Sequence, residues 1–286
     1  MTSRAQRIAA AFKWACLSEL EAPKPGNVHV FAPGHRMTAD EFIASAEAAA
    51  ESLSASGARV GARILEAVDA TFAAVGLNSN LGIILLCAPL AAAADTGHDL
   101  QPALVRVLRN LDTEDATLAF RAIVRAAPAG LGHSARHDVF APATVSLLQA
   151  MTEAADRDRV ARQYATDFAD VFEIGAPLYA AAAKRYADLK WATLATYLGF
   201  LSAFPDTHIV RKLGEETAAE VQHTAAAFQA SLQATRYPVE LLPELLAWDA
   251  ALKAEGINPG TSADLTVATL FAHRLRTILP SVRNSG

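Results

Sequence analysis

The feature that most constrains the fold is the recurrence of apolar side chains at helical spacing along the chain. Ile8, Phe12 and Cys16 follow one another at four-residue steps. A second stripe runs through residues 60–72, and Gly76 follows it in the position of a helix C-cap. No segment alternates apolar and polar residues for long, and no Asn-Gly or Asp-Gly hairpin signal is present. The sequence therefore predicts an all-α fold.

The same periodicity predicts about ten helices. A capping box of Thr38 and Glu41 marks one start, and alanine, the strongest helix former, is abundant. The further helical stretches cover residues 102–111, 114–127, 143–154, 157–172, 177–204, 213–234, 238–255 and 263–279. No low-complexity linker or fixed-period repeat divides the chain, so we expect a single large domain over residues 1–286.

Composition excludes several classes of protein. Hydrophobic residues make up 52% and charged residues 19%, which argues against disorder. A net charge of −5 makes nucleic acid an unexpected partner. The N-terminus lacks the pattern of a secretion signal, and the most apolar run, 81–94, is shorter than the roughly 20 residues that span a bilayer. We expect a cytoplasmic protein without membrane contact, in which Cys16 and Cys87 are buried small hydrophobes.

Four polar loops interrupt the apolar background, and loops on a rigid scaffold are where function is usually found. The first is stiffened by two prolines and a glycine, which fix its backbone while polar side chains project from it. The loops are Pro23 to His29 (continued at 33–37), Asn78 to Gly82, Phe204 to His208 with Arg211, and Asn258 to Asp264.

The last two loops each allow two interpretations. Residues 258–264 are either a turn with an N-cap and an acid, or a phosphate site in which Gly260 permits close approach to amides at a helix N-terminus. In the second case Mg²⁺ would bridge Asp264 and the phosphate. Asp206 either caps the next turn, or acts as a metal ligand or base while Arg211 holds phosphate.

The acids and amides of the N-terminal half are equally open. Glu66 and Asp69 share one helix face and are most simply solvated, although an acid there would also help to hold a cation. Asn78 and Asn80 either stabilise a turn or read a nucleobase or ribose. Because no GxGxxG, GxxxxGK[ST] or HExxH motif is present, nucleotide binding needs another route.

Taken in order, the loops resemble the motifs of the triphosphoribosyl-dephospho-CoA synthase family, the enzymes that prepare the prosthetic group of citrate lyase and malonate decarboxylase. The resemblance extends from Glu19 to about Phe271. It is carried by Pro23-Lys24-Pro25-Gly26, His35, Met37, Phe42, Ser45, Glu66, Asn78 to Gly82, Asp206-Thr207-His208, Arg211, Gly214 and Pro259 to Leu265.

The resemblance implies an all-α pentosyltransferase that joins the ribosyl carbon of ATP to the ribose of 3′-dephospho-CoA and expels adenine. Such a transfer needs a base, help for the departing adenine, and Mg²⁺ with cations on the triphosphate. The implied catalytic residues are Asp206, Asp264 and His35, and the implied metal ligands are Glu66, Asp206 and Asp264. The implied nucleotide and phosphate contacts are Lys24, Asn27, His29, Asn78, Ser79, Asn80, Thr207, His208, Arg211, Gly260 and Ser262.

The chain also departs from the family pattern. Asn78-Ser79-Asn80-Leu81-Gly82 replaces a motif that resembles Asn-Thr-His-Lys-Gly, so a phosphate-binding Lys and a His are missing. His208 stands where Asn is usual, and Thr261 stands where a second glycine is usual. Two alternatives therefore stay open: a relative that acts on another phosphorylated cofactor precursor, for example in pterin-linked one-carbon metabolism, and a non-catalytic nucleotide-binding protein. The alanine-rich helices also leave a homodimer open.

Overall fold

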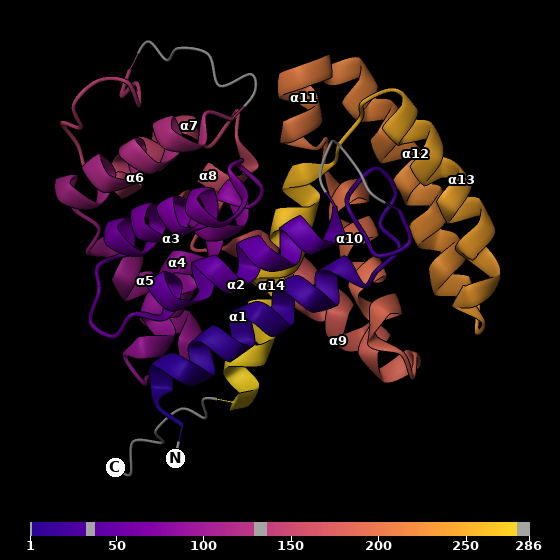
Figure 1. Cartoon of the computed structure of the whole chain (residues 1–286). Coiled ribbons are helices and arrows are strands. Elements are labelled where there is room, and N and C mark those ends of the chain that lie inside the picture. Colours follow the sequence, from indigo (N-terminus) through magenta and orange to yellow (C-terminus); the bar gives the residue numbers. More distant parts are fainter. Residues whose placement is uncertain (1, 33–37, 129–135, 279–286) are drawn as a thin grey trace. The chain divides into compact units, whose positions relative to one another are not determined.

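The computed structural model confirms the all-α prediction (Figure 1). It describes residues 2–32, 38–128 and 136–278. Within these residues the structure contains fourteen α-helices, a π-helical segment and a 3-10 segment, and no strand beyond an isolated bridge between His29 and Ala32. The helix count exceeds the predicted ten because the stretch 177–204 is divided into two helices, and because Leu81–Asp95 and Thr207–Leu213 are helices outside the predicted stretches.

The chain forms two compact units. Unit 1 comprises residues 1–15, 42–168 and 271–286, and unit 2 comprises residues 16–41 and 169–270. The helices that lie in unit 1, wholly or for most of their length, are α1 (Arg4–Leu20), α2 (Ala39–Ser54), α3 (Val60–Val75), α4 (Leu81–Asp95), α5 (Leu100–Arg109), α6 (Thr113–Ala126), α7 (Leu147–Ala154) and α8 (Arg159–Ala165). The single domain over residues 1–286 stays a prediction.

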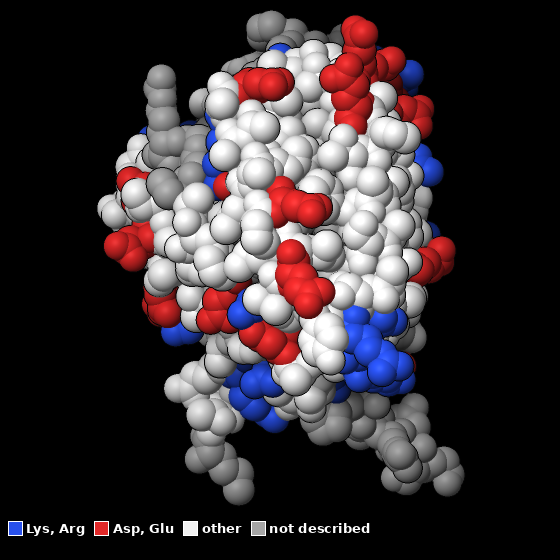
Figure 2. Space-filling view, turned by 90° about the vertical axis from the view of Figure 1, so that its right-hand side faces the viewer, with Lys and Arg blue, Asp and Glu red and all other residues white. Residues whose placement is uncertain are grey.

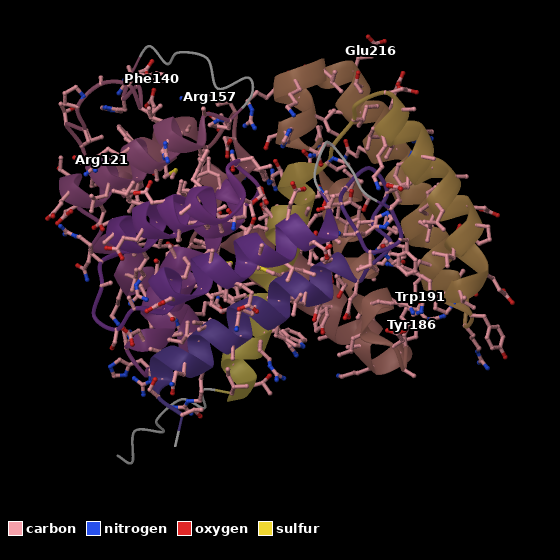
Figure 3. All side chains as sticks on the ribbon, in the orientation of Figure 1. Arg121, Phe140, Arg157, Tyr186, Trp191 and Glu216 are labelled. Atoms are coloured by element: carbon pink, nitrogen blue, oxygen red, sulfur yellow. The ribbon has the colours of Figure 1, made fainter. Side chains whose placement is uncertain are left out.

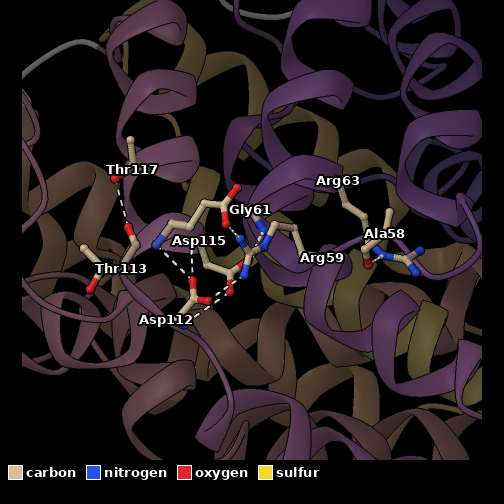
Figure 4. A network of polar contacts seen from close by, with 9 residues as sticks. Ala58, Arg59, Gly61, Arg63, Asp112, Thr113, Asp115 and Thr117 are labelled. Atoms are coloured by element: carbon tan, nitrogen blue, oxygen red, sulfur yellow. Dashed lines mark hydrogen bonds and ion pairs between the residues drawn. The ribbon is translucent and has the colours of Figure 1, made fainter.

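Unit 1 is built around α4, which is apolar on all sides and almost entirely buried. Helices α3 and α6 approach closely at Gly61, where an added Cβ would lie 2.7 Å from the Cα of Asp115. The Gly61 amide donates to the Asp115 carboxylate at 2.8 Å, and Arg59 pairs with Asp112 at 2.6 Å across the same helices (Figure 4). The predicted C-cap is confirmed, because Gly76 is left-handed with φ of 73°.

Unit 2 is organised around α10 (Leu189–Ala203), whose side chains from Trp191 to Leu201 are buried. Its other elements are η1 (Asp170–Gly175), α9 (Ala176–Arg185), α11 (Thr207–Leu213), α12 (Glu215–Ala234), η2 (Pro238–Leu241), α13 (Leu242–Ala254) and most of α14 (Gly260–Ile278). The predicted capping box is confirmed, since Glu41 N donates to Thr38 Oγ1 at 3.2 Å and Thr38 N donates back to Glu41.

The stretch predicted as one helix over 177–204 is two helices, and that part of the prediction was wrong. Tyr186 is extended, and the Asp188 side chain caps a new helix by accepting from Lys190 N. Figure 3 labels Tyr186 and Trp191 on either side of this break. The Tyr186 hydroxyl donates to the Leu232 carbonyl at 2.5 Å, so a tertiary contact holds the break that helix propensity alone does not predict.

Among the described residues, no single helix is long and apolar enough to cross a membrane. Helices α4 and α5 would pass such a test only together, and the pair bends by 112°. On the face shown in Figure 2, acidic side chains are spread over a largely uncharged surface, and a group of basic side chains lies at its lower right.

Candidate functional site

Buried polar contacts from α1 and α10 hold the first predicted loop, Pro23 to His29. The Lys24 ammonium is fully buried, 3.1 Å from Glu19 Oε1, and donates to the Val28 carbonyl at 2.6 Å. The Tyr197 hydroxyl of α10 donates to the Pro25 carbonyl at 2.7 Å. Burial lowers the pKa of Lys24, against the opposing effect of Glu19. In this structure Lys24 is therefore one half of a buried ion pair.

The first loop contacts the fourth. Gly26 is left-handed with φ of +79°, and a Cβ on it would lie 2.8 Å from Pro259 Cδ. Asn27 Nδ2 donates to Asn258 Oδ1 at 2.9 Å. A glycine is thus required at position 26 both by its backbone angle and by the proximity of the 258–264 loop.

Asp206 links the third loop to the fourth. Its Oδ1 accepts from the amides of His208 and Ile209 at 2.9 and 3.3 Å, which caps α11. Its Oδ2 accepts from the amide and the hydroxyl of Ser262, both at 2.8 Å. Burial raises the pKa of Asp206, while these hydrogen bonds act to lower it. The anion at the start of α14 is here the carboxylate of Asp206.

The same two loops also touch through their neighbouring residues. Thr207 Oγ1 and Thr261 Oγ1 lie 3.0 Å apart, and the His208 amide donates to Thr261 Oγ1 at 3.2 Å. The His208 ring covers Gly260, where a Cβ would lie 2.5 Å from His208 Nδ1. The third and fourth loops are therefore packed without space for a larger side chain at position 260.

Asp264 differs from its surroundings on α14. Every residue from Pro259 to Ala272 is buried except Asp264, which is half-buried. Burial raises the pKa of the Cys16 thiol, and the negative charges of Glu19 and Asp264 raise it further. Asp264 is therefore the carboxylate of this helix start that reaches solvent.

Cations lie at the other end of α11. Arg211 is half-buried and Lys212 exposed, both in the last turn of the helix. Partial burial, followed by the charge of Arg211, lowers the pKa of Lys212. Two adjacent cations of this kind suit a polyanionic ligand.

The remaining predicted residues belong to unit 1 or are outside the description. Glu66 is exposed on α3, which agrees with the simpler interpretation of a solvated acid. Asn78 Oδ1 accepts from the Leu81 amide at 3.2 Å, so it stabilises the turn. Ser79 and Asn80 both reach Ser45 of α2, at 2.6 and 3.4 Å. His35 lies outside the described residues.

Sequence reasoning missed the acid and the lysine of α13 that complete unit 2's polar interior. Asp249 is 3% exposed, and Lys253 lies one helical turn further along. The available signal was the stripe of Leu245, Asp249 and Leu252, which places a carboxylate at core spacing. No group of three or more His, Cys, Asp or Glu side chains that could hold a metal ion is found among the described residues.

Comparisons with known proteins identify the family of the chain. The model of the ATP:dephospho-CoA triphosphoribosyl transferase family matches residues 5–282. A crystal structure from Archaeoglobus fulgidus, provisionally described as a triphosphoribosyl-dephospho-CoA synthase, is 26% identical with a TM-score of 0.62. The match covers 81% of this chain and 97% of that one. No curated protein matches. The chain is thus a transferase resembling triphosphoribosyl-dephospho-CoA synthase. It belongs to the ATP:dephospho-CoA triphosphoribosyl transferase family.

Proposed function

We propose that the protein transfers the triphosphoribosyl group of ATP to 3′-dephospho-CoA and releases adenine, at a site built from the polar loops of unit 2. The observation that carries this proposal is the direct contact among three loops far apart in sequence. Asn27 bonds Asn258, and Asp206 bonds Ser262, so loops 23–29, 204–211 and 258–264 form one cluster. All three carry residues on which the resemblance to the family rests, and all three lie within the residues that the family model matches.

In this reaction the bond between ribose C1′ and adenine breaks, and a bond forms between C1′ and a ribose hydroxyl of the acceptor. The proton of that hydroxyl goes to a base, the departing adenine takes up a proton, and the triphosphate stays on the product. The transition state has oxocarbenium character, which a nearby carboxylate stabilises. The site must also neutralise a triphosphate that carries several negative charges.

Asp264 is the acid that we assign to this chemistry, as base or as metal ligand. It is half-buried, whereas Asp206 is fully buried and receives four hydrogen bonds. A carboxylate has about four lone-pair sites, so Asp206 has no acceptor left for a metal or a proton. We therefore assign Asp206 to holding the loops together.

Mg²⁺ fits this site, because it is usually held by one or two carboxylates together with substrate phosphates. Asp264 would supply the carboxylate, and the ion would neutralise charge on the triphosphate. Arg211 and Lys212 supply further positive charge. Of the other predicted nucleotide contacts in unit 2, Asn27, Thr207 and His208 are half-buried and are kept in this proposal. The remaining four are buried within the contacts described above, and we assign them to shaping the loops: Lys24, His29, Gly260 and Ser262.

The test is to incubate the purified chain with ATP, Mg²⁺ and 3′-dephospho-CoA and to measure free adenine. We expect adenine in proportion to the coupled product, and none after chelation of Mg²⁺. Asp264→Asn should lower the rate by about a hundredfold or more at an unchanged melting temperature. Glu244→Gln, an exposed acid on α13, is the matched control. Intact ATP binding without adenine release would refute the proposal.

The altered second loop favours testing a second acceptor. Residues 78–82 lack the Lys and His of the family pattern, and Asn78 and Asn80 are occupied by turn and helix contacts. A different phosphorylated cofactor precursor, such as a pterin-linked one, is therefore the alternative acceptor. Adenine release with that acceptor, and not with dephospho-CoA, would identify the divergent relative.

A further inference from the structure

A cluster of buried charged and titratable side chains joins the first loop to the helices that pack against it. It consists of two ion pairs, Glu19 with Lys24 at 3.1 Å and Asp249 with Lys253 at 2.8 Å, with His29 between them. The Glu19, Lys24, His29 and Asp249 side chains are at most 4% exposed, and Lys253 is 13% exposed. Two carboxylates and two ammonium groups balance, so the cluster is neutral as long as all four groups stay ionised.

Asp249 reaches both halves of the loop at once. Its Oδ1 accepts from the Gly26 amide at 2.8 Å, and its Oδ2 lies 3.3 Å from His29 Nε2. Lys253 extends the attachment, since its Nζ donates to the Ala32 carbonyl at 3.3 Å. Asp249 and Lys253 of α13 thus hold the first loop at Gly26 and His29, and the chain just after it at Ala32.

The loop has little regular structure of its own to replace these contacts. Its backbone bonds are those of turns and of the bridge between His29 and Ala32, together with Val30 N to the Leu20 carbonyl at 3.1 Å. Buried ion pairs add little to net stability because desolvation offsets their attraction. Their best-attested use is to impose one geometry, which suits a loop that needs one geometry.

The charge states agree with this geometry. Burial acts to raise the pKa of Asp249, but its hydrogen bonds with His29, Lys253 and the Gly26 amide lower it overall. Burial, helped by Lys253 and Lys24, lowers the pKa of His29 against the opposing effect of Asp249. At neutral pH a carboxylate therefore faces a neutral imidazole and an ammonium group.

We propose that Asp249, held by Lys253, is a positioning residue that fixes residues Gly26 to His29 in the conformation that binds the nucleotide. The inference rests on the proposed function, because it assumes that this loop contacts substrate. Asp249 itself acts through the Gly26 amide and the His29 ring.

The experiment compares Asp249→Asn, Lys253→Met, the double variant Asp249→Asn/Lys253→Met, and the control Glu244→Gln. Asparagine keeps an oxygen for the Gly26 amide but presents an NH₂ group to Lys253, and the cluster gains a net positive charge. The double variant restores neutrality. The readouts are adenine release per folded molecule and hydrogen exchange of peptides covering residues 21–32.

We expect Asp249→Asn to lower kcat/KM for ATP by about ten- to a hundredfold and to accelerate exchange in 21–32, with Glu244→Gln within about twofold of wild type. The double variant should recover part of both losses. Unchanged exchange, or a loss of activity fully explained by unfolded protein, would overturn the inference. If wild type releases no adenine, the proposed function fails, while the exchange measurement still decides whether Asp249 holds the loop.

Discussion

Replacing Asp206 with alanine tests whether this residue holds the scaffold together. The α11 cap is worth about 1 kcal/mol. The Ser262 amide and hydroxyl are buried, and each would lose its acceptor at roughly 1–3 kcal/mol. Removing a buried carboxylate recovers part of its desolvation cost. The expected loss in free energy of unfolding is therefore about 3 kcal/mol or more.

The matched control is Asp188→Ala. Asp188 also caps a helix of unit 2, but it is half-exposed and its side chain has no hydrogen bond beyond Lys190 among those described. It should cost about 1 kcal/mol. Urea unfolding followed by circular dichroism at 222 nm measures both variants. The difference between them, about 2 kcal/mol or more, isolates the two bonds to Ser262.

Equal losses in the two variants would show that the contacts to Ser262 contribute nothing, and the scaffold interpretation would fail. An Asp206→Ala protein with wild-type stability but no adenine release would contradict it more strongly, because Asp206 would then be catalytic. Ser262→Ala, which removes only the hydroxyl, should lie between wild type and Asp206→Ala.

Two further predictions concern single sites. Gly61→Ala should destabilise the protein by about 1–3 kcal/mol, because the new Cβ meets the backbone of Asp115; an unchanged melting temperature would contradict the close helix approach. The pKa of His29 is lowered in the folded state, so the unfolded chain binds more protons below the ordinary value near 6.5. Stability therefore falls as the pH is lowered through this range. His29→Gln should lose less stability between pH 7 and pH 5 than wild type, and parallel pH curves for the two proteins would refute this.

The sequence was sufficient for what depends on local pattern. Helical spacing of apolar residues predicted the all-α fold, and Gly76 and the Thr38–Glu41 pair marked helix ends where the structure has them. It did not predict the break at Tyr186, because apolar residues continue across it and the bond to Leu232 is tertiary. Propensity describes a segment, whereas this break depends on a helix distant in sequence.

For the candidate site, too, local pattern predicts one part and tertiary packing determines the rest. The loops were visible as clusters of polar residues, and the resemblance to the family pointed to Asp206 and Asp264 as candidates. Tertiary packing decides that Asp206 is fully buried and that Asp264 reaches solvent, and helical periodicity does not predict this packing. Asp249 was not predicted for a related reason. An acid within a stripe of apolar residues interrupts the apolar pattern, so the pattern does not mark it as buried.

The contact between His208 and Thr261 lies at two positions where this chain departs from the family pattern. The His208 amide donates to a hydroxyl that a glycine at position 261 would lack. The donor is the backbone N–H of position 208, which an asparagine there would also carry, so the hydroxyl of Thr261 alone adds this contact. Reverting Thr261 to glycine removes the contact but leaves the amide bonded to Asp206, whereas reverting His208 to asparagine keeps it. A chimeric enzyme can therefore exchange the two positions separately.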